Sequence, residues 1–269
     1  MRDYLFLPDQ FHRQHDVCMS LIGQIEEFII DAKYDNLKSY SIELSGNHLS
    51  KNEHIFNFLL RTGKQDDHDK IVKGTVVRAL LMDICYFSQE AFTCSLKKRL
   101  SVTFALIRKP FVFSLIVILR ILFEEKFIEK FNSDLEFDPA KVTNDERNQL
   151  IDLSLKCLTT PVYTVEDINR LIFDKIDPGS LINMSDRALH LSTTRNENNL
   201  TGVQNFNFIF SIDKDIQTQW KWIYSRMPAL LLYLVQLTDV LVFNTIKTEK
   251  SFLTDRLVAR AKIFKKNKR

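Results

Sequence analysis

The stretch Phe104-Ala-Leu-Ile-Arg-Lys-Pro-Phe-Val-Phe-Ser-Leu115 places two basic residues and a proline between two runs of apolar side chains. Proline fits the first turn of a helix and disfavours the α conformation in the residue before it. The sequence therefore predicts a helix boundary at Arg108-Lys109-Pro110, with one apolar helix over 72–99 before it and another over 110–131 after it. We expect this corner to be the structural centre of the fold.

The composition favours long helices around this corner. The 269 residues include only 6 Gly and 6 Pro but 21 Phe, whereas turn-rich β folds use Gly and Pro at most connections. The predicted fold class is all-α: a multi-helix bundle of about nine helices with at most one short strand. That strand is 205–211, where three Phe alternate with other residues. An extended segment that inserts the three rings into the core fits the same pattern.

We expect one helical domain over 1–269, with the acidic linker 132–144 as the best place to divide it. The N-terminal half alone does not provide an obvious partner surface for the apolar stretch 79–131. Thr164 and Ser180 are predicted to cap helices that start after them, because their hydroxyls accept hydrogen bonds from free backbone N–H groups.

Two strongly apolar stretches, 111–119 and 227–243, raise the question of a membrane span. Nine helical residues rise roughly 13 Å, less than half of a hydrocarbon core of about 30 Å. The second stretch carries Gln236 and Asp239, which a lipid-facing helix rarely contains. The four cysteines show no metal-binding or disulfide spacing, as in reduced proteins. We therefore expect a cytoplasmic protein without a transmembrane segment.

The positive charge lies at one end of the chain. The net charge is +3, yet residues 256–269 hold seven basic side chains and no acid, which leaves 30 basic against 34 acidic residues elsewhere, or −4. Lys265 and Lys266 are the candidate contacts of this tail, which includes part of a predicted amphipathic helix over 252–264. Such a tail fits nucleic-acid contact, membrane-surface contact or a solubilising role.

Arg61 and His68 are separated by six residues, in a segment over 62–70 that is predicted to be a loop. The spacing resembles the Arg–His signature of HEPN-type ribonucleases, all-α proteins of prokaryotic toxin and phage-defence systems. The resemblance implies that both side chains act on RNA at a dimer interface without a metal. Neutral His is a suitable base near pH 7, and Arg binds phosphate.

The stretches 104–115 and 205–211 resemble segments of uncharacterised all-α proteins from bacteria and their mobile elements. That resemblance implies no established activity. Arg108 and Lys109 have two interpretations: they hold helix-ending carbonyls or pair with acids such as Glu124, or they form an anion-binding corner at a helix N-terminus.

Two further residues, His190 and Arg195, border the polar stretch 192–205 and are candidate binding residues, although a His at the end of an apolar helix commonly has a structural role. Trp220 and Trp222 are two residues apart, so we expect one to pack inward and the other to be exposed, where it could stack on a base or contact a partner. Glycine-rich phosphate loops and the common hydrolase motifs are absent from the sequence, and we expect no metal and no cofactor.

Three functions remain open. The leading hypothesis is a helical interaction protein that binds a protein or RNA partner and forms an oligomer, in a bacterial defence or mobile-element context. The first alternative is a HEPN-like, metal-independent ribonuclease that uses Arg61 and His68. The second is a peripheral membrane protein that uses its basic C-terminal helix.

Overall fold

The computed structural model describes residues 3–42, 48–158, 163–194, 197, 200–209 and 211–266. Within these residues it contains eleven α-helices and no strand. The all-α prediction is confirmed, and the predicted number of about nine helices is too low. The described part of 205–211 forms turns, so the predicted strand is wrong there, while Phe210 lies outside the described residues.

The eleven α-helices are joined by two π-helical segments, η3 and η4, and two short 3-10 segments, η1 and η2. Their bounds are η1 Asp9–Phe11, α1 His12–Ile30, η2 Ala32–Leu37, α2 Ile55–Arg61, α3 Gln65–Leu96, α4 Leu100–Arg108, η3 Lys109–Ser114, α5 Leu115–Phe123, α6 Phe127–Ser133, α7 Asn144–Cys157, α8 Val165–Ile168, η4 Asn169–Phe173, α9 Leu181–Leu189, α10 Asp213–Thr245 and α11 Lys250–Lys266.

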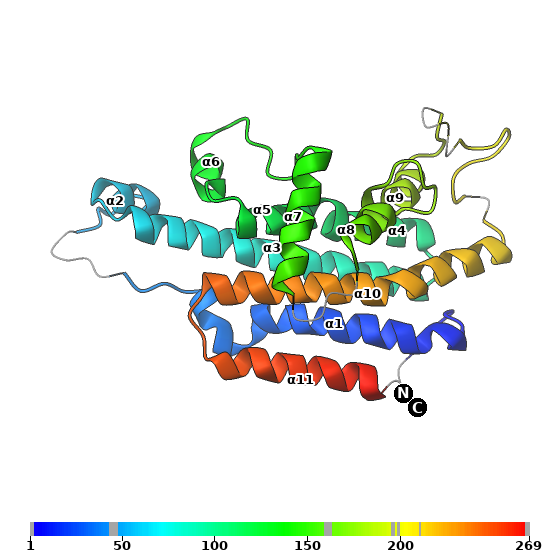
Figure 1. Cartoon of the computed structure of the whole chain (residues 1–269), viewed down its shortest axis with the longest axis horizontal. Helices are drawn as coiled ribbons and strands as arrows, with labels where there is room; N and C mark the ends of the chain where they lie inside the picture. The colour runs from blue at the N-terminus through cyan, green and yellow to red at the C-terminus, as the bar shows by residue number, and fades with distance from the viewer. Residues whose placement is uncertain are drawn as a thin grey trace.

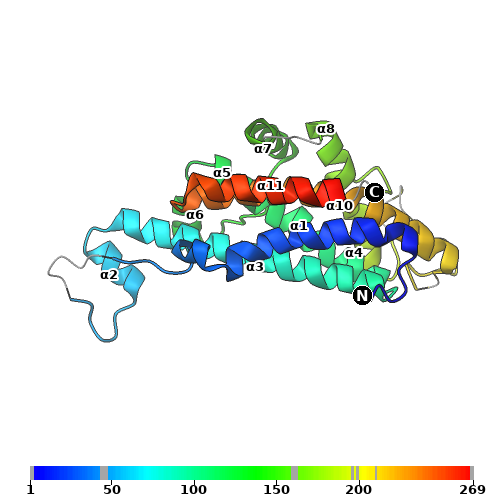
Figure 2. The same ribbon diagram turned by 90° about the horizontal axis from the view of Figure 1, so that it is seen from below.

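Four helices, α1, α3, α10 and α11, run along the long axis of the molecule (Figures 1 and 2). The first of these packs against α3 on one side and against α10 and α11 on others, so the two ends of the chain form one bundle. Buried apolar side chains from Leu7 to Ile246 belong to a single core, which draws on helices before and after the linker 132–144. The helix α7 stands across the long helices in Figure 1.

The helix does not end at Pro110, so the predicted boundary there is wrong. Helices α4 and α5 are joined by the π-helical segment η3 into one continuous helix over 100–123. Proline in an α-helix lacks one N–H group and its ring collides with a carbonyl in the preceding turn. A π turn widens the backbone locally, and the N–H of Leu115 donates to the carbonyl of Pro110, five residues earlier.

This continuity removes the length argument against a membrane span. The helices over 100–123 and 213–245 are both long and apolar enough to cross a membrane, by length and composition. Most of each apolar window is buried inside the protein, 56% and 67% respectively, and core helices of soluble proteins pass the same test. The expected absence of a transmembrane segment therefore stays a prediction.

The helix α10 also continues through a proline. Pro228 lies inside α10, and its neighbours Met227 and Leu230 are completely buried. Packing of an apolar face into a core supplies most of a helix's stability in proteins. Burial on both sides of Pro228 offsets the cost of the missing backbone hydrogen bond.

Two predicted caps are confirmed. The hydroxyl of Thr164 accepts from the backbone N–H of Asp167, and the hydroxyl of Ser180 accepts from that of Asn183. By contrast, the predicted loop over 62–70 is largely wrong, because α3 begins at Gln65. Two aspartates in its first turn, Asp66 and Asp67, favour a helix start there by interacting with the positive end of the helix dipole.

Two arginines of α11 are buried and hold this helix on the bundle. The guanidinium groups of Arg256 and Arg260 donate to opposite carboxylate oxygens of Asp239 in α10, with 2.8 Å between Arg256 Nε and Asp239 Oδ1. All three residues are at most 5% exposed. In α1, Glu27 accepts from Arg256 at 2.8 Å and Gln24 from Arg260 at 2.9 Å. Two acids thus balance two guanidinium groups at the junction of α1, α10 and α11.

Removing the central carboxylate should destabilise the protein strongly. We expect Asp239→Asn to lower the free energy of unfolding by about 3 kcal/mol or more, because two guanidinium groups then stay buried with one acid between them. The matched control is Asp152→Asn in the exposed pair with Lys156, which should cost about 0.5 kcal/mol or less. Urea unfolding followed by circular dichroism measures both values, and equal losses would contradict the structural role of Asp239.

Burial also sets the reactivity of the four thiols. Cys18 and Cys85 are completely buried, and burial raises the pKa of Cys85 to about 12 and that of Cys18 well above its ordinary value. Cys157 is exposed. Because the thiolate is the reactive form, we expect a disulfide reagent at pH 8 to modify Cys157 rapidly and Cys18 and Cys85 only after unfolding. Mass spectrometry of the modified peptides identifies the labelled thiols, and the Cys157→Ser variant is the control that should lose the rapid labelling. Labelling of Cys85 before unfolding would contradict this prediction.

Candidate functional site

Arg61 and His68 lie on two adjacent helices but have separate partners. Arg61, at the end of α2, forms a two-point ion pair with Glu53, with distances of 2.8 and 2.9 Å. His68 is in α3, 6% exposed, with its Nδ1 2.9 Å from Asp69 Oδ1 and its ring 5.2 Å from that of Phe56. The guanidinium charge that would bind a phosphate is thus neutralised by Glu53. The ribonuclease hypothesis stays a prediction.

Arg108 and Lys109 are both ion-paired, and the helix over 100–123 continues through them. Arg108 pairs with Asp186 and donates to Ser185 Oγ at 3.3 Å, and both partners lie on α9. Lys109 Nζ lies 2.5 Å from Asp83 Oδ2 and 4.4 Å from the ring centre of Phe87. The anion-binding interpretation required a helix N-terminus at Pro110, which the continuous helix over 100–123 does not provide.

The acid that the sequence suggested for this pair has other partners. Glu124, at the end of α5, accepts from Arg120 at 2.6 Å and from Lys130 at 2.7 Å. Arg120 is 8% exposed and also donates to the carbonyls of Asp138 and Lys141. Arg120 therefore ties the linker 134–143 to the apolar helix, a role that nothing in its sequence neighbourhood indicated.

The remaining predicted residues lie apart from one another. His190 is exposed at the end of α9, where its carbonyl accepts from Asn207. Arg195 falls outside the described residues. Lys265 is exposed near the end of α11, and nothing is described of the side chain of Lys266.

The tryptophan prediction is wrong, because both indoles are buried. Trp220 donates to the carbonyl of Ser95 and Trp222 to the carbonyl of Gly179. Trp220 contacts α3 and Trp222 contacts the 178–179 turn, so two sides of α10 are covered here.

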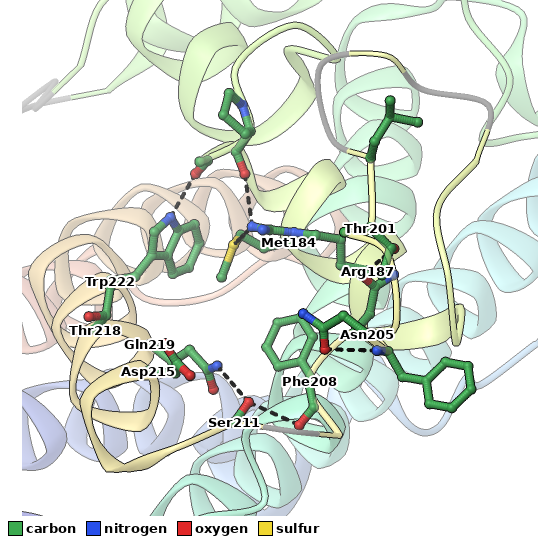
Figure 3. A pocket seen from close by; sticks show the side chains of 16 residues that line it. Met184, Arg187, Thr201, Asn205, Phe208, Ser211, Asp215, Thr218, Gln219 and Trp222 are labelled. Carbon is green, nitrogen blue, oxygen red and sulfur yellow. Dashed lines mark hydrogen bonds between the residues drawn. The ribbon is translucent and has the colours of Figure 1, made fainter.

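A cavity of about 550 Å³ lies between α9, the segment 200–211 and the first half of α10 (Figure 3). Its wall combines apolar groups with amides, hydroxyls, one guanidinium and one carboxylate. The lining includes Arg187, Asn207, Phe208, Asp215, Gln219 and Trp222. Arg187 of α9 and Trp222 of α10 donate to the carbonyls of Pro178 and Gly179, and Figure 3 shows Phe208 and Ser211 below them in this view.

Arg187 is the cation of this cavity, and Asp215, which accepts from the backbone N–H of Ile212, is its acid. It donates to the carbonyl of Pro178 at 3.1 Å and contacts the sulfur of Met184. Its Nε–H is buried without a hydrogen-bond partner, and no carboxylate pairs with the side chain in the described part of the chain. Burial lowers the pKa of the guanidinium, which nevertheless remains protonated at neutral pH. An unpaired cation with an unsatisfied donor favours an anionic ligand.

The loop that closes the cavity is strained. Gln204 has a φ of 58° and Phe208 a φ of 63°, a region that bulky residues rarely adopt. The ring of Phe208 packs 5.6 Å from that of Phe104, so the core holds this conformation in place. Backbone strain of this kind concentrates at ligand-binding sites.

Sequence reasoning missed Arg187 and selected its neighbour His190. The stretch 181–189 gives no sign that Arg187 lies at a cavity, because its unpaired state depends on which acids reach it from distant segments. Across the described residues, no group of three or more His, Cys, Asp or Glu side chains is placed to hold a metal ion. Comparison of the chain with protein-family models, curated proteins and solved structures finds no significant match.

The unpaired state of Arg187 can be tested by stability. We expect Arg187→Met to leave the free energy of unfolding unchanged or to raise it by up to about 1 kcal/mol, since it removes a half-buried charge that no carboxylate of the described residues pairs with. Arg120→Met should lower it by about 2 kcal/mol or more, because Arg120 pairs with Glu124 and two carbonyls. Urea unfolding measures the free energy of unfolding of both variants. A large decrease for Arg187→Met would show that Arg187 stabilises the fold and would contradict a role in ligand binding.

Proposed function

We propose that the protein is a binding protein that recognises a partner protein through the surface around the α9–α10 connection. The observation that supports it is a concentration of exposed apolar side chains between positions 189 and 212. The members of this surface, here called the 189–212 surface, are Leu189, Leu191, Leu200, Val203, Phe206, Ile209 and Ile212, each 47% to 95% exposed. Soluble proteins rarely expose such a set together unless a partner covers it.

The charge of this surface favours a protein over RNA. The segment 189–212 contains a single Arg or Lys, Arg195. Binding to a nucleic-acid backbone depends on several basic side chains that neutralise phosphates, whereas protein interfaces have apolar centres with few charges. The exposed bases of α11, Lys262 and Lys265, lie on another helix.

Burial of two arginines also weakens the case for membrane binding by the C-terminal helix. Arg256 and Arg260 are paired with Asp239 and Glu27 in the interior, so they do not contribute to a basic surface. The outward side of α11 includes Asp255 and Val258 as well as lysines. An amphipathic membrane helix needs its cations and its apolar residues on opposite faces.

The cavity beneath the surface suggests the chemistry of the partner. Arg187 suits a carboxylate, from an acidic side chain or a chain terminus. Apolar side chains of the partner would cover the 189–212 surface, and the amides and hydroxyls of the cavity would orient its backbone. The partner segment is thus an apolar peptide with one carboxylate. A second copy of the chain is a special case of this proposal.

Selection from a displayed peptide library on the immobilised full-length protein tests this function. We expect enriched peptides to combine apolar residues with a carboxylate. The double variant Val203→Asp/Ile209→Asp should weaken their binding at least tenfold because it places charges in the apolar contact. Leu135→Asp is the matched control: Leu135 is at least as exposed as Val203 and Ile209 but lies in the linker after α6, so binding should be unchanged. Light scattering of both variants tests self-association through the same surface.

Two results would contradict the proposal. One is peptide binding that is insensitive to the double variant but lost in Leu135→Asp. The other is RNA cleavage by the purified protein that His68→Ala abolishes, which would support the ribonuclease alternative in its place.

A further inference from the structure

A second cavity, of about 900 Å³, lies on the other side of α9 from the first one, among η3, α7 and the α8–η4 helix. Ile182 of α9 lines this cavity, while Met184 and Arg187 of the same helix line the first. In Figure 1 α7 and α8 lie next to each other above the long helices, and the two contact directly.

Both π-helical segments of the described chain border this one cavity. Val112 and Phe113 of η3 form one wall, and Asn169 and Phe173 of η4 form another. The π turn of η4 is closed by the N–H of Asp174, which donates to the carbonyl of Asn169 at 2.9 Å. Single π turns are rare and occur frequently at functional sites, where they redirect side chains.

Arg147 of α7 brings a positive charge to the cavity. Its Nε–H donates to Asn169 Oδ1 at 3.0 Å, and its guanidinium lies 4.6 Å from the ring centre of Phe173. The amide of Asn169 in turn donates to Asn148 Oδ1 at 2.8 Å. The guanidinium is thus held in one orientation by groups of η4. Its two terminal nitrogens, Nη1 and Nη2, have no hydrogen-bond partner among the described residues and can bind a ligand.

The lining also contains Glu166 and Lys175, which are both exposed, and three charged side chains with partners. Arg170 pairs with Asp167 at 3.2 Å, and Asp167 also caps α8. Asp174 accepts from the backbone N–H groups of Ile176 and Asp177. Over the described residues Arg147 has no carboxylate partner, and its half-buried position lowers its pKa. Arg147 is therefore the partly buried cation of this cavity, and an amide and an aromatic ring hold it in place.

The rest of the lining is largely apolar on one side, including Val112, Ile116, Val142 and Phe173. Cavities of this volume hold small molecules, and a mixed lining with one charged group orients them. We propose that this cavity binds a small amphiphilic anion, with its acidic group on Arg147 and its apolar body against the η3 wall. This site is distinct from the 189–212 surface and does not depend on the peptide-binding proposal.

Two dyes with nearly the same apolar body test the site. One is 8-anilinonaphthalene-1-sulfonate, which carries an anionic sulfonate, and the other is N-phenyl-1-naphthylamine, which does not. We expect Arg147→Gln to raise the dissociation constant of the sulfonate at least tenfold and that of the neutral dye less than twofold. Lys156→Gln is the matched control, because Lys156 lies on the same helix as Arg147 but outside the cavity lining and pairs with Asp152. It should leave both dissociation constants within twofold.

Location is tested on the wild-type protein, so the result does not depend on the variants folding. Hydrogen exchange with and without saturating sulfonate dye should show protection in 144–148 and 165–173. Protection confined to 189–222 would place the dye at the first cavity and overturn the proposal. An equal loss of both dyes in Arg147→Gln, or no loss of either, would also overturn it.

Carboxylate and phosphate ligands are distinguished by displacement. Decanoate and decyl phosphate have the same apolar chain and differ in the acidic group, while decanol carries none. Displacement of the sulfonate dye from the wild type by either acid, at concentrations at least tenfold lower than decanol requires, supports the site. The acid that displaces the dye at the lower concentration carries the acidic group that the site prefers. Equal displacement by decanol would overturn the role of Arg147.

Discussion

A proline inside a buried helix is the constraint on which much of this structure depends. Pro110 has no N–H to donate and its ring needs space in the preceding turn. The chain meets this need with a π turn, so that α4 and α5 remain one helix of apolar side chains. The wider turn also changes the direction in which the following side chains point. Val112 and Phe113 consequently face the second cavity. Arg108, just before the π turn, pairs with Asp186 on α9.

The helix α9 connects the two candidate sites. It is held against the π segment by the pair of Arg108 with Asp186, and its residues line both cavities. A shift of α9 caused by a ligand in one cavity would therefore change the wall of the other. The two cavities share one chemical feature. Each contains a guanidinium, Arg187 in the first and Arg147 in the second, that no carboxylate in the described chain neutralises.

Some basic side chains of the C-terminal segment are buried in ion pairs and others are exposed, and the sequence does not distinguish the two. Of the seven bases in 256–269, Arg256 and Arg260 are in the interior, where Asp239 and Glu27 balance them. Breaking such a pair costs far more than breaking an exposed one, because the remaining charge stays buried. This explains why an apolar helix such as α10 carries an aspartate. It also explains why net charge along the chain is a poor guide to where the protein binds its partners.

Composition and pattern alone determined the fold class, the helix caps at Thr164 and Ser180 and most of the helical regions, because these depend on neighbours within a few residues. The tertiary structure decided the rest. Helices continue through Pro110 and Pro228 since core packing outweighs a local preference. Ion-pair partners lie tens or hundreds of positions apart, as in Arg108 with Asp186 or Arg256 with Glu27. For the same reason the sequence pointed to His190 and not to Arg187: a cation is available to a ligand only where the folded chain brings no acid to it.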